Sequence, residues 1–277
     1  MSEQTPEHRR QRTFRLEAVV LRHFDWGEAD RLVWLFSLEL GKLRAVAKGV
    51  RKPRSRKAGH LEPFTRASLL LARGRDLPII TQAETLDAYL PLSDDLLRVS
   101  YASYVVELLD RFTYEEGENR GLYRLLVDTL GRLCQPVDPD EGTRLDLVTR
   151  FYEMRLLDYV GFRPQLFRCT SCGEEILPQD QYFSASQGGI LCPRCGPQFT
   201  GSRAISMQAL KYLRHFQRSN FTQASQAVLT PVVNREMENI TQHYITYLLE
   251  RSLNTPPFLR RARQAAPEIG QEDSEGG

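Results

Sequence analysis

The sequence lacks several features that whole classes of protein require. It contains no run of about 18 apolar residues, and residues 1–13 have no apolar core of the kind that a signal peptide needs, so we expect no membrane span and a cytoplasmic location. Neither a G-x-x-x-x-G-K-S/T loop nor a G-x-G-x-x-G motif occurs, so nothing predicts an ATP or dinucleotide pocket. The five histidines are scattered and form no H-E-x-x-H ligand pair. The function must therefore be sought in the distribution of charge and of cysteine.

Acidic residues cluster at three places: Asp94 with Asp95, Glu115 with Glu116, and residues 138–141. Carboxylates grouped in this way could hold the two metal ions of a nuclease. All three groups, however, fall at expected helix starts or in loops, where Asp and Glu are common as caps and as partners of the helix dipole. We interpret them as structural, and a metal-dependent nuclease remains an alternative.

Basic residues are concentrated in residues 41–75. This window holds eleven Lys or Arg against one acidic residue, Glu62, although the whole chain holds 37 basic and 35 acidic residues. An imbalance of this size needs an anionic partner at physiological salt, and a nucleic-acid backbone is the simplest polyanion to supply it. The ten candidate nucleic-acid-binding residues are Lys42, Arg44, Lys48, Arg51, Lys52, Arg54, Arg56, Lys57, Arg73 and Arg75.

Aromatic residues are few inside this basic window. Phe64 lies within it, and Trp26, Trp34 and Phe36 lie upstream. Because base stacking needs aromatic side chains, we expect contacts to the phosphate backbone to outweigh stacking. Such contacts carry weak sequence preference and should hold both single-stranded and double-stranded DNA.

Residues 14–86 alternate apolar and polar side chains in short segments separated by turn residues. The expected strands are 14–21, 29–38, 42–48, 64–72 and 78–86, with an exposed basic loop at 51–60 that contains Pro53 and Gly59. Five short strands predict a small closed barrel of the OB type, although the pattern fits an SH3-like barrel almost as well. The basic window then lies on a folded surface.

After Pro91 the hydrophobic period changes from two residues to about 3.6, which indicates helices and a new domain. The expected helices run from a cap at Ser93 to residue 112, from 120 to 134, from a cap at Asp140 to residue 160, from 206 to 216, and from Thr230 to residue 253. The predicted fold class is α+β and multidomain. The expected parts are an extension at 1–13, the OB-type barrel at 14–88, a helical domain at 89–165, a zinc ribbon insert at 166–200, helices at 201–257 that complete the helical domain, and a disordered tail at 258–277.

Four of the five cysteines form two C-x-x-C-G knuckles, Cys169 with Cys172 and Cys192 with Cys195, separated by nineteen residues. This spacing is typical of a four-cysteine zinc ribbon, and a redox dithiol would not need a second matching knuckle. Four thiolates fill the coordination sphere of zinc, so we expect one structural ion and no catalytic role for it. Only two basic residues lie in 168–196, which gives little support to a nucleic-acid contact by the ribbon itself.

The chain resembles a known family in its first seventy residues. The segments that carry the resemblance are E-A-V-V-L at 17–21, G-E-A-D-R-L at 27–32, G-K-L-R-A-V-A-K-G-V-R-K-P at 41–53, Ser55, and L-E-P-F at 61–64. They closely resemble the N-terminal pattern of the bacterial RecO family of DNA-repair and recombination-mediator proteins. The order of barrel, helices and a four-cysteine insert before the last helices is also similar.

The resemblance implies a DNA-binding protein associated with the nucleoid. It implies annealing of complementary strands and help in loading the RecA recombinase onto strands covered by single-strand-binding protein. The partners it implies are RecR, in some cases RecF, and the acidic C-terminal tail of single-strand-binding protein docked on the helical region. Annealing makes and breaks no covalent bond, so the resemblance agrees with the absence of a nucleotide motif and we expect no catalytic residue. Besides the nuclease, an RNA-binding or transcription-associated zinc-ribbon protein remains an alternative.

Overall fold

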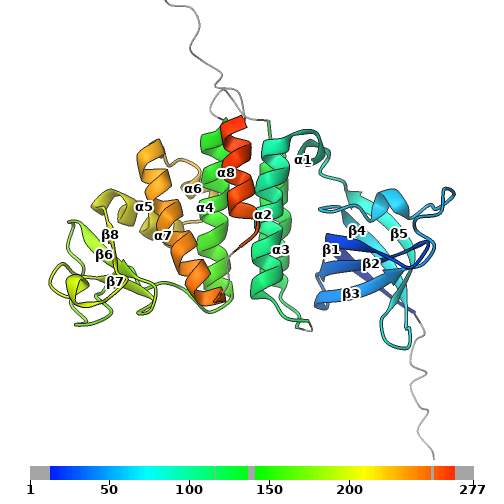
Figure 1. Ribbon diagram of the computed structural model, residues 1–277, viewed down its shortest axis with the longest axis horizontal. Helices are drawn as coiled ribbons and strands as arrows, with labels where there is room; N and C mark the ends of the chain where they lie inside the picture. The colour runs from blue at the N-terminus through cyan, green and yellow to red at the C-terminus, as the bar shows by residue number, and fades with distance from the viewer. Residues whose placement is uncertain (1–12, 116, 137–140, 251–252, 266–277) are drawn as a thin grey trace, which may run out of the picture. The chain divides into compact units, whose positions relative to one another are not determined.

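The computed structural model describes residues 13–115, 117–136, 141–250 and 253–265 (Figure 1). Within these ranges the chain forms two compact units. The first comprises the described residues up to Ala88 together with Tyr114–Tyr123, and the second comprises Tyr89–Thr113 and the described residues from Arg124 onward. Each unit is described separately below.

The first unit is a closed five-stranded barrel. Its strands are β1 (Thr13–Trp26), β2 (Asp30–Ser37), β3 (Gly41–Ala47), β4 (Arg66–Ala72) and β5 (Ile79–Asp87), in the spatial order β1-β2-β3-β5-β4. All neighbours are antiparallel except β3 and β5, which meet in a parallel pair at Val46 and Ile79. A short 3-10 helix, Ala58–His60, interrupts the connection from β3 to β4. The barrel and its strand order confirm the predicted OB-type fold.

Apolar side chains at alternate positions fill the barrel because successive residues of a strand point to opposite faces. Leu16, Ala18 and Val20 of β1 point inward with Val33 and Leu35 of β2. All five are at most 2% exposed. The same alternation on the other strands completes the core with small residues on β3 and leucines on β4.

A β-bulge at Leu21 changes which residues of β1 face outward. Val20 is opposite the inward-facing Leu35, but Arg22 is opposite Trp34, which lies on the outer face because its neighbours point inward. If Leu21 were paired regularly and formed no bulge, position 22 would continue the inward series of Leu16, Ala18 and Val20. The bulge therefore places the side chains of positions 22, 24 and 26 on the outside of the barrel.

The segment Tyr114–Tyr123 packs against the barrel, which the sequence did not predict. Glu115 pairs with Lys42 in a parallel β-bridge, and the hydroxyl of Tyr123 donates to the carboxylate of Glu17 at 2.7 Å. A Cβ on Gly41 would lie only 2.1 Å from the Gly117 carbonyl oxygen, and the φ of Gly41 is +67°. Glycine is therefore required at position 41 both by the backbone angle and by the close approach.

The second unit is helical and carries a small sheet. Its helices are α1 (Leu90–Asp94), α2 (Leu96–Phe112), α3 (Arg120–Leu133) from Arg124 onward, α4 (Glu141–Tyr159), α5 (Met207–Arg218), α6 (Phe221–Ala224), α7 (Pro231–Leu249) and α8 (Thr255–Ala265). Between α4 and α5 lie β6 (Gln181–Ser184), β7 (Gly189–Leu191), the 3-10 helix Gly196–Gln198 and β8 (Arg203–Ile205), and the sheet order is β7-β6-β8. Strands β6 and β7 form an antiparallel hairpin between the two knuckles, and β8 pairs with the other edge of β6. Helices α2, α4, α7 and α8 lie side by side (Figure 1).

The N-cap of α2 differs from the predicted one. Asp95, not Ser93, caps this helix, because its carboxylate accepts from the backbone N–H of Leu97 at 2.6 Å and of Arg98 at 3.1 Å. Ser93 lies inside the separate short helix α1. Ser206 before α5 and Thr230 before α7 cap their helices as predicted, and the predicted cap Asp140 lies outside the described residues.

The prediction of a disordered tail from residue 258 is wrong as far as residue 265, and residues 266–277 lie outside the described ones. Residues 258–265 form most of α8, because prolines in the first helical turn, where no N–H is needed, begin a helix here. Leu259 is fully buried. The carboxylate of Glu107 accepts from the backbone N–H groups of Asn254 and Thr255 and so anchors the start of the helix.

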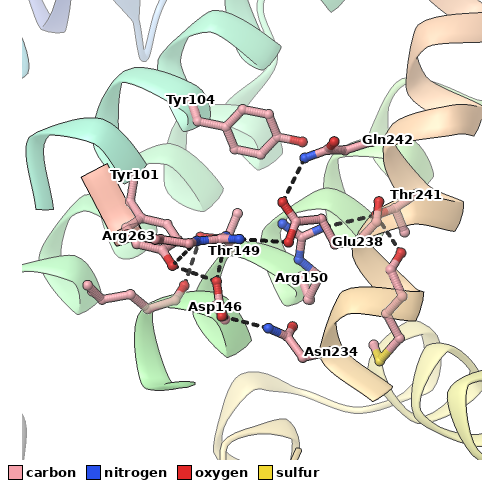
Figure 2. Close-up of polar contacts among 12 residues, drawn as sticks. Tyr101, Tyr104, Asp146, Thr149, Arg150, Asn234, Glu238, Thr241, Gln242 and Arg263 are labelled. Atoms are coloured by element: carbon pink, nitrogen blue, oxygen red, sulfur yellow. Dashed lines mark hydrogen bonds and ion pairs between the residues drawn. The ribbon is translucent and has the colours of Figure 1, made fainter. Parts of the chain in front are cut away.

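Ionised and hydroxyl groups form a buried network among α2, α4, α7 and α8 (Figure 2). Arg150 and Glu153 are fully buried and form an ion pair at 2.9 Å between Nη1 and Oε2. Tyr104 donates to Glu153 Oε1 at 2.6 Å, and Thr241 donates to Glu153 Oε2 at 2.9 Å. Burial nevertheless raises the pKa of Glu153, although Arg150 and the two hydroxyl groups oppose the increase.

Arg263 joins α8 to the same network. Its guanidinium pairs with Asp146 at 2.6 Å and with Glu238 at 2.7 Å. Burial alone would raise the pKa of Glu238, but Arg150 and Arg263 outweigh it and lower the pKa. Figure 2 shows Tyr101 and Asn234 beside Asp146, and Asn234 donates to this carboxylate at 2.6 Å. Three charged groups that are largely shielded from solvent, Arg263 with Asp146 and Glu238, thus fix α8 to α4 and α7.

Candidate nucleic-acid interface and metal centre

Six of the ten predicted nucleic-acid-binding residues have exposed, unpaired side chains. None of the six makes a side-chain hydrogen bond or ion pair to any residue that the structure describes. They are Lys48, Lys52, Arg54 and Arg56 in the β3–β4 connection, and Arg73 and Arg75 between β4 and β5. An exposed cation without a protein partner keeps its full attraction for an external anion.

The other four residues contact the protein itself. Arg51 pairs with Asp25 at 3.3 Å, and Arg44 forms an ion pair with Glu115. Lys57 donates to the carbonyl oxygens of Lys48 at 3.0 Å and Ile80 at 2.9 Å, and burial lowers its pKa against the opposing effect of Asp30.

Lys42 is half-buried and bridged to Glu115 through the backbone. The structure therefore gives Lys57 and Arg51 a role in holding the loop, and it places Arg44 and Lys42 beside acidic residues.

The start of the basic loop is tied to the turn between β1 and β2. The Arg51 backbone N–H donates to the Ala29 carbonyl at 2.9 Å, and the Gly49 N–H donates to Asp30 Oδ1 at 2.7 Å. The Arg51 guanidinium also reaches the carbonyl oxygens of Gly27 and Glu28. Consequently the unpaired Lys52 follows directly after a residue that is fixed to the β1–β2 turn.

An aromatic cluster on the outer face of this hairpin was not included among the predicted site residues. The Arg22 guanidinium lies 4.2 Å from the centroid of the Trp34 ring and 5.3 Å from that of Phe24. Phe24 and Trp34 pack edge to face at 5.2 Å. The sequence shows these aromatics, but it does not reveal the bulge that brings positions 22 and 24 onto the face of Trp34.

A pocket of about 650 Å³ opens in the first unit, lined by residues of β3 and by Glu115, Gly117 and Glu118. Its lining mixes both signs of charge, since Lys42 and Arg44 face Glu39, Glu115 and Glu118. Mixed charge in an open pocket does not define a site for a polyanion, and we assign no ligand to it.

The four knuckle cysteines converge on one point. All their Sγ atoms lie within 4.8 Å of one another, and those of Cys172 and Cys192 are 3.9 Å apart. Zinc–sulfur bonds of about 2.3 Å in a tetrahedron place neighbouring sulfurs roughly 3.8 Å apart, so the arrangement fits a bound metal ion. Cys169 and Cys195 are buried and the other two are more exposed.

Tight turns bring the cysteines together. The Gly173 N–H donates to the Cys169 carbonyl, the Gly196 N–H donates to the Cys192 carbonyl, and Gly173 has a φ of +74°. A Cβ on Gly196 would lie 2.3 Å from the Tyr182 ring, so the second knuckle needs glycine for close packing on β6.

The thiols of Cys169 and Cys195 differ in pKa when no metal ion is bound. Burial would raise the pKa of Cys169, but the backbone N–H groups of Cys172, Cys192 and Ser171 outweigh it and lower the pKa to about 6. The pKa of Cys195 is raised to about 11, first by its interaction with the Cys192 thiol and then by burial. Crowded sulfurs cannot all ionise unless a cation balances them, which is the condition that a structural metal ion satisfies.

No helix among the described residues is long and apolar enough to cross a membrane.

The fold and the cysteine site define a class: a protein with an OB-type barrel, a helical unit and a four-cysteine metal-binding motif. Residues 11–89 match the family described as Recombination protein O N terminal, and residues 93–257 match Recombination protein O C terminal. The DNA repair protein RecO of Roseiflexus sp. (strain RS-1) is 40% identical over 255 residues, which cover 92% of this chain and 88% of that protein. The DNA repair protein RecO of Pelotomaculum thermopropionicum is 36% identical over 264 residues, which cover 94% of this chain and 98% of that protein. The chain belongs to the RecO family of DNA repair proteins, which confirms the resemblance seen in the first seventy residues.

Proposed function

We propose that this protein is a recombination mediator that binds DNA on its barrel and anneals complementary single strands without ATP. It assists the loading of RecA onto strands covered by single-strand-binding protein, and its partners are RecR, the tail of single-strand-binding protein, and in some settings RecF. The observation that carries the proposal is the set of six exposed, unpaired cations on one barrel in a chain of the RecO family. The site of action that follows is the nucleoid in the cytoplasm.

Annealing follows from charge and proximity alone. Two complementary strands repel each other through their phosphates, and a cationic surface that neutralises some of these phosphates lowers the repulsion and raises the local strand concentration. Base pairing then supplies the free energy. No bond is made or broken, so the mechanism needs no nucleophile, general base or nucleotide, and the protein acts as a binding surface and not as an enzyme.

We further propose that the ion held by Cys169, Cys172, Cys192 and Cys195 is one zinc ion with a structural role. Four cysteine sulfurs favour zinc over harder cations such as magnesium or calcium, and they leave no coordination position open for water or substrate. The ion would join the segment before β6 to the segment after β7.

Annealing of two fluorescently labelled complementary oligonucleotides tests the proposed function. We expect faster annealing with protein than without, in EDTA and without ATP, and also on strands coated with single-strand-binding protein. A variant with Lys48, Lys52, Arg54 and Arg56 changed to alanine should lose most of this acceleration, because these side chains have no protein partner and are left to bind phosphate.

The matched control removes the same charge elsewhere. Lys211, Arg235, Arg260 and Arg261 are exposed residues of α5, α7 and α8, and their replacement by alanine should leave annealing near the parent rate. Equal losses in both variants would refute the placement of the DNA site on the barrel. Magnesium-dependent shortening of either strand would instead identify the nuclease, and tighter binding of RNA than of DNA would favour an RNA-binding protein.

A further inference from the structure

The tip of the β1–β2 hairpin exposes two large aromatic rings in a unit that already carries unpaired cations. Trp26 is 55% exposed and Phe24 is 52% exposed, although burying such rings would stabilise the fold. Both lie on β1 two positions apart and therefore on the same face. We propose that Trp26 and Phe24 form a base-stacking site for single-stranded DNA, an inference that rests on the DNA-binding function proposed above.

The site is held in a defined geometry. The bulge at Leu21 turns positions 22, 24 and 26 to the outer face. Phe24 is then fixed edge to face against Trp34 and beneath the Arg22 guanidinium. A ring fixed in this way loses little conformational entropy when a base stacks on it, whereas a freely rotating side chain would lose more.

One cation is bound at the turn of this hairpin, and three more follow it closely in the sequence. Arg51 is bonded to the carbonyl groups of the turn that follows Trp26, and the unpaired Lys52, Arg54 and Arg56 come within the next five residues. A single strand exposes both base faces and phosphates, so it can use the rings and the cations at once. Charge complementarity therefore selects this occupant over an apolar peptide, which would leave the three unpaired cations Lys52, Arg54 and Arg56 without compensation.

Stacking distinguishes single strands from duplexes. In a duplex the base faces are covered by neighbouring base pairs, so only the phosphates remain for the basic loop. Stacking occupies the face of a base and leaves its pairing edge free, which is the state in which a complementary strand can be recognised. The site thus adds a single-strand preference to a surface that the composition alone predicted to bind both forms through phosphates.

Tryptophan fluorescence tests this proposal directly, because the chain has only two tryptophans, Trp26 and Trp34. A Trp34→Phe variant of the full-length chain keeps an aromatic ring beside Arg22 and leaves Trp26 as the only tryptophan. We expect oligothymidylate to quench this fluorescence and a duplex of the same length to leave it nearly unchanged. Unchanged fluorescence while anisotropy shows oligothymidylate bound would overturn the proposal.

Affinity measurements give the second readout. Trp26→Ala should bind oligothymidylate about tenfold more weakly and duplex with unchanged affinity, because one stacked base is removed. Tyr114→Ala is the matched control, since Tyr114 is an aromatic of the same unit that is 88% exposed and lies outside the hairpin. Equal weakening of both DNA forms by Trp26→Ala would overturn the proposal.

Self-association is measured in parallel. If Trp26→Ala changed only the sedimentation of the protein, the tip would be a contact between copies of the chain and the stacking proposal would fail. Failure of the parent protein to bind any DNA would instead overturn the proposed function itself.

Discussion

Two sets of arginines, one in the loops of the barrel and one among the helices, are used in opposite ways. Arg54 and Arg56 of the barrel are exposed and have no partner among the described residues. In the helical unit, Arg150 is fully buried and paired with Glu153, and the partly buried Arg263 is paired with Glu238 and Asp146. A buried guanidinium has lost its hydration, and its ion pair compensates for that loss. An exposed guanidinium keeps its hydration and can exchange it for a phosphate. Position relative to solvent, and not residue type, decides whether an arginine supports the fold or binds a ligand.

The zinc centre proposed above would balance charge in a third way, and its disruption should have the largest effect. Cys192→Ser should reduce bound zinc from one ion per chain to none, because a structural zinc ion contributes about 10 kcal/mol or more of apparent binding free energy through all four ligands. Elemental analysis of protein purified without chelator measures the metal. Cys134→Ser serves as the control, and loss of zinc in that variant would contradict the ligand assignment.

The same substitution in both units tests the comparison itself. Arg150→Met should lower the free energy of unfolding by about 3 to 5 kcal/mol, because Glu153 is left buried without its partner. Arg54→Met on the exposed loop should change it by less than about 0.5 kcal/mol. Urea unfolding followed by circular dichroism measures both, and equal stabilities would mean that the buried pair contributes nothing net.

The salt dependence of DNA binding should respond to changes in the exposed cations of the barrel and not to changes in the buried arginine of the helical unit. The variant with alanine at positions 48, 52, 54 and 56 should bind DNA far more weakly, and the slope of log K against log salt should fall by roughly 0.7 to 0.9 for each phosphate that the protein no longer neutralises. Fluorescence anisotropy from low to high salt gives the slope. The Arg150→Met variant, measured under conditions in which it is folded, should keep the slope of the parent protein. A reduced slope in this variant would contradict the distinction between the two sets of arginines.

Acid should weaken the helical network through Glu238. Since the pKa of Glu238 is lowered in the folded state, its ionised form stabilises the protein above the unfolded pKa near 4.5 and the contribution is lost as the pH falls. At pH 7, Glu238→Gln should be less stable than the parent by about 1 to 3 kcal/mol because a charged hydrogen bond is removed. The difference should narrow below about pH 4.5, and urea unfolding at pH 7, 5 and 4 measures it. A constant difference would show that Glu238 is not ionised in the folded protein.

Local patterns in the sequence predicted the parts of the fold that depend on short-range order. Alternation predicted the five strands, and the spacing of the knuckles predicted the convergence of Cys169, Cys172, Cys192 and Cys195. Both signals are local because a strand or a knuckle is specified by residues a few positions apart. The spacing of the cysteines alone therefore predicted which four cysteines the structure brings together.

Features that depend on contacts distant in sequence could not be predicted. The bridge between Lys42 and Glu115 joins residues far apart in the chain, and so does the contact of Arg263 with Asp146. The run of basic residues marked Lys57 and Arg51 as equivalent to Arg54, although the first two are bound to backbone carbonyls of the barrel. Charge count identifies a surface, but only the partners of each side chain show which charges remain available.

The bulge at Leu21 reverses, partway along β1, which of the odd-numbered and even-numbered residues face the interior. Up to Val20, even-numbered residues belong to the interior, and from Arg22 onward they belong to the exterior, so one inserted residue assigns Trp26 to the surface. If Leu21 took a regular place in the ladder with β2 instead of forming a bulge, the far half of the strand would shift by one position, which would direct Phe24 and Trp26 inward without altering either residue. The exposure of the aromatic rings at the hairpin tip thus depends on the pairing register of β1 as much as on the residues that the tip contains.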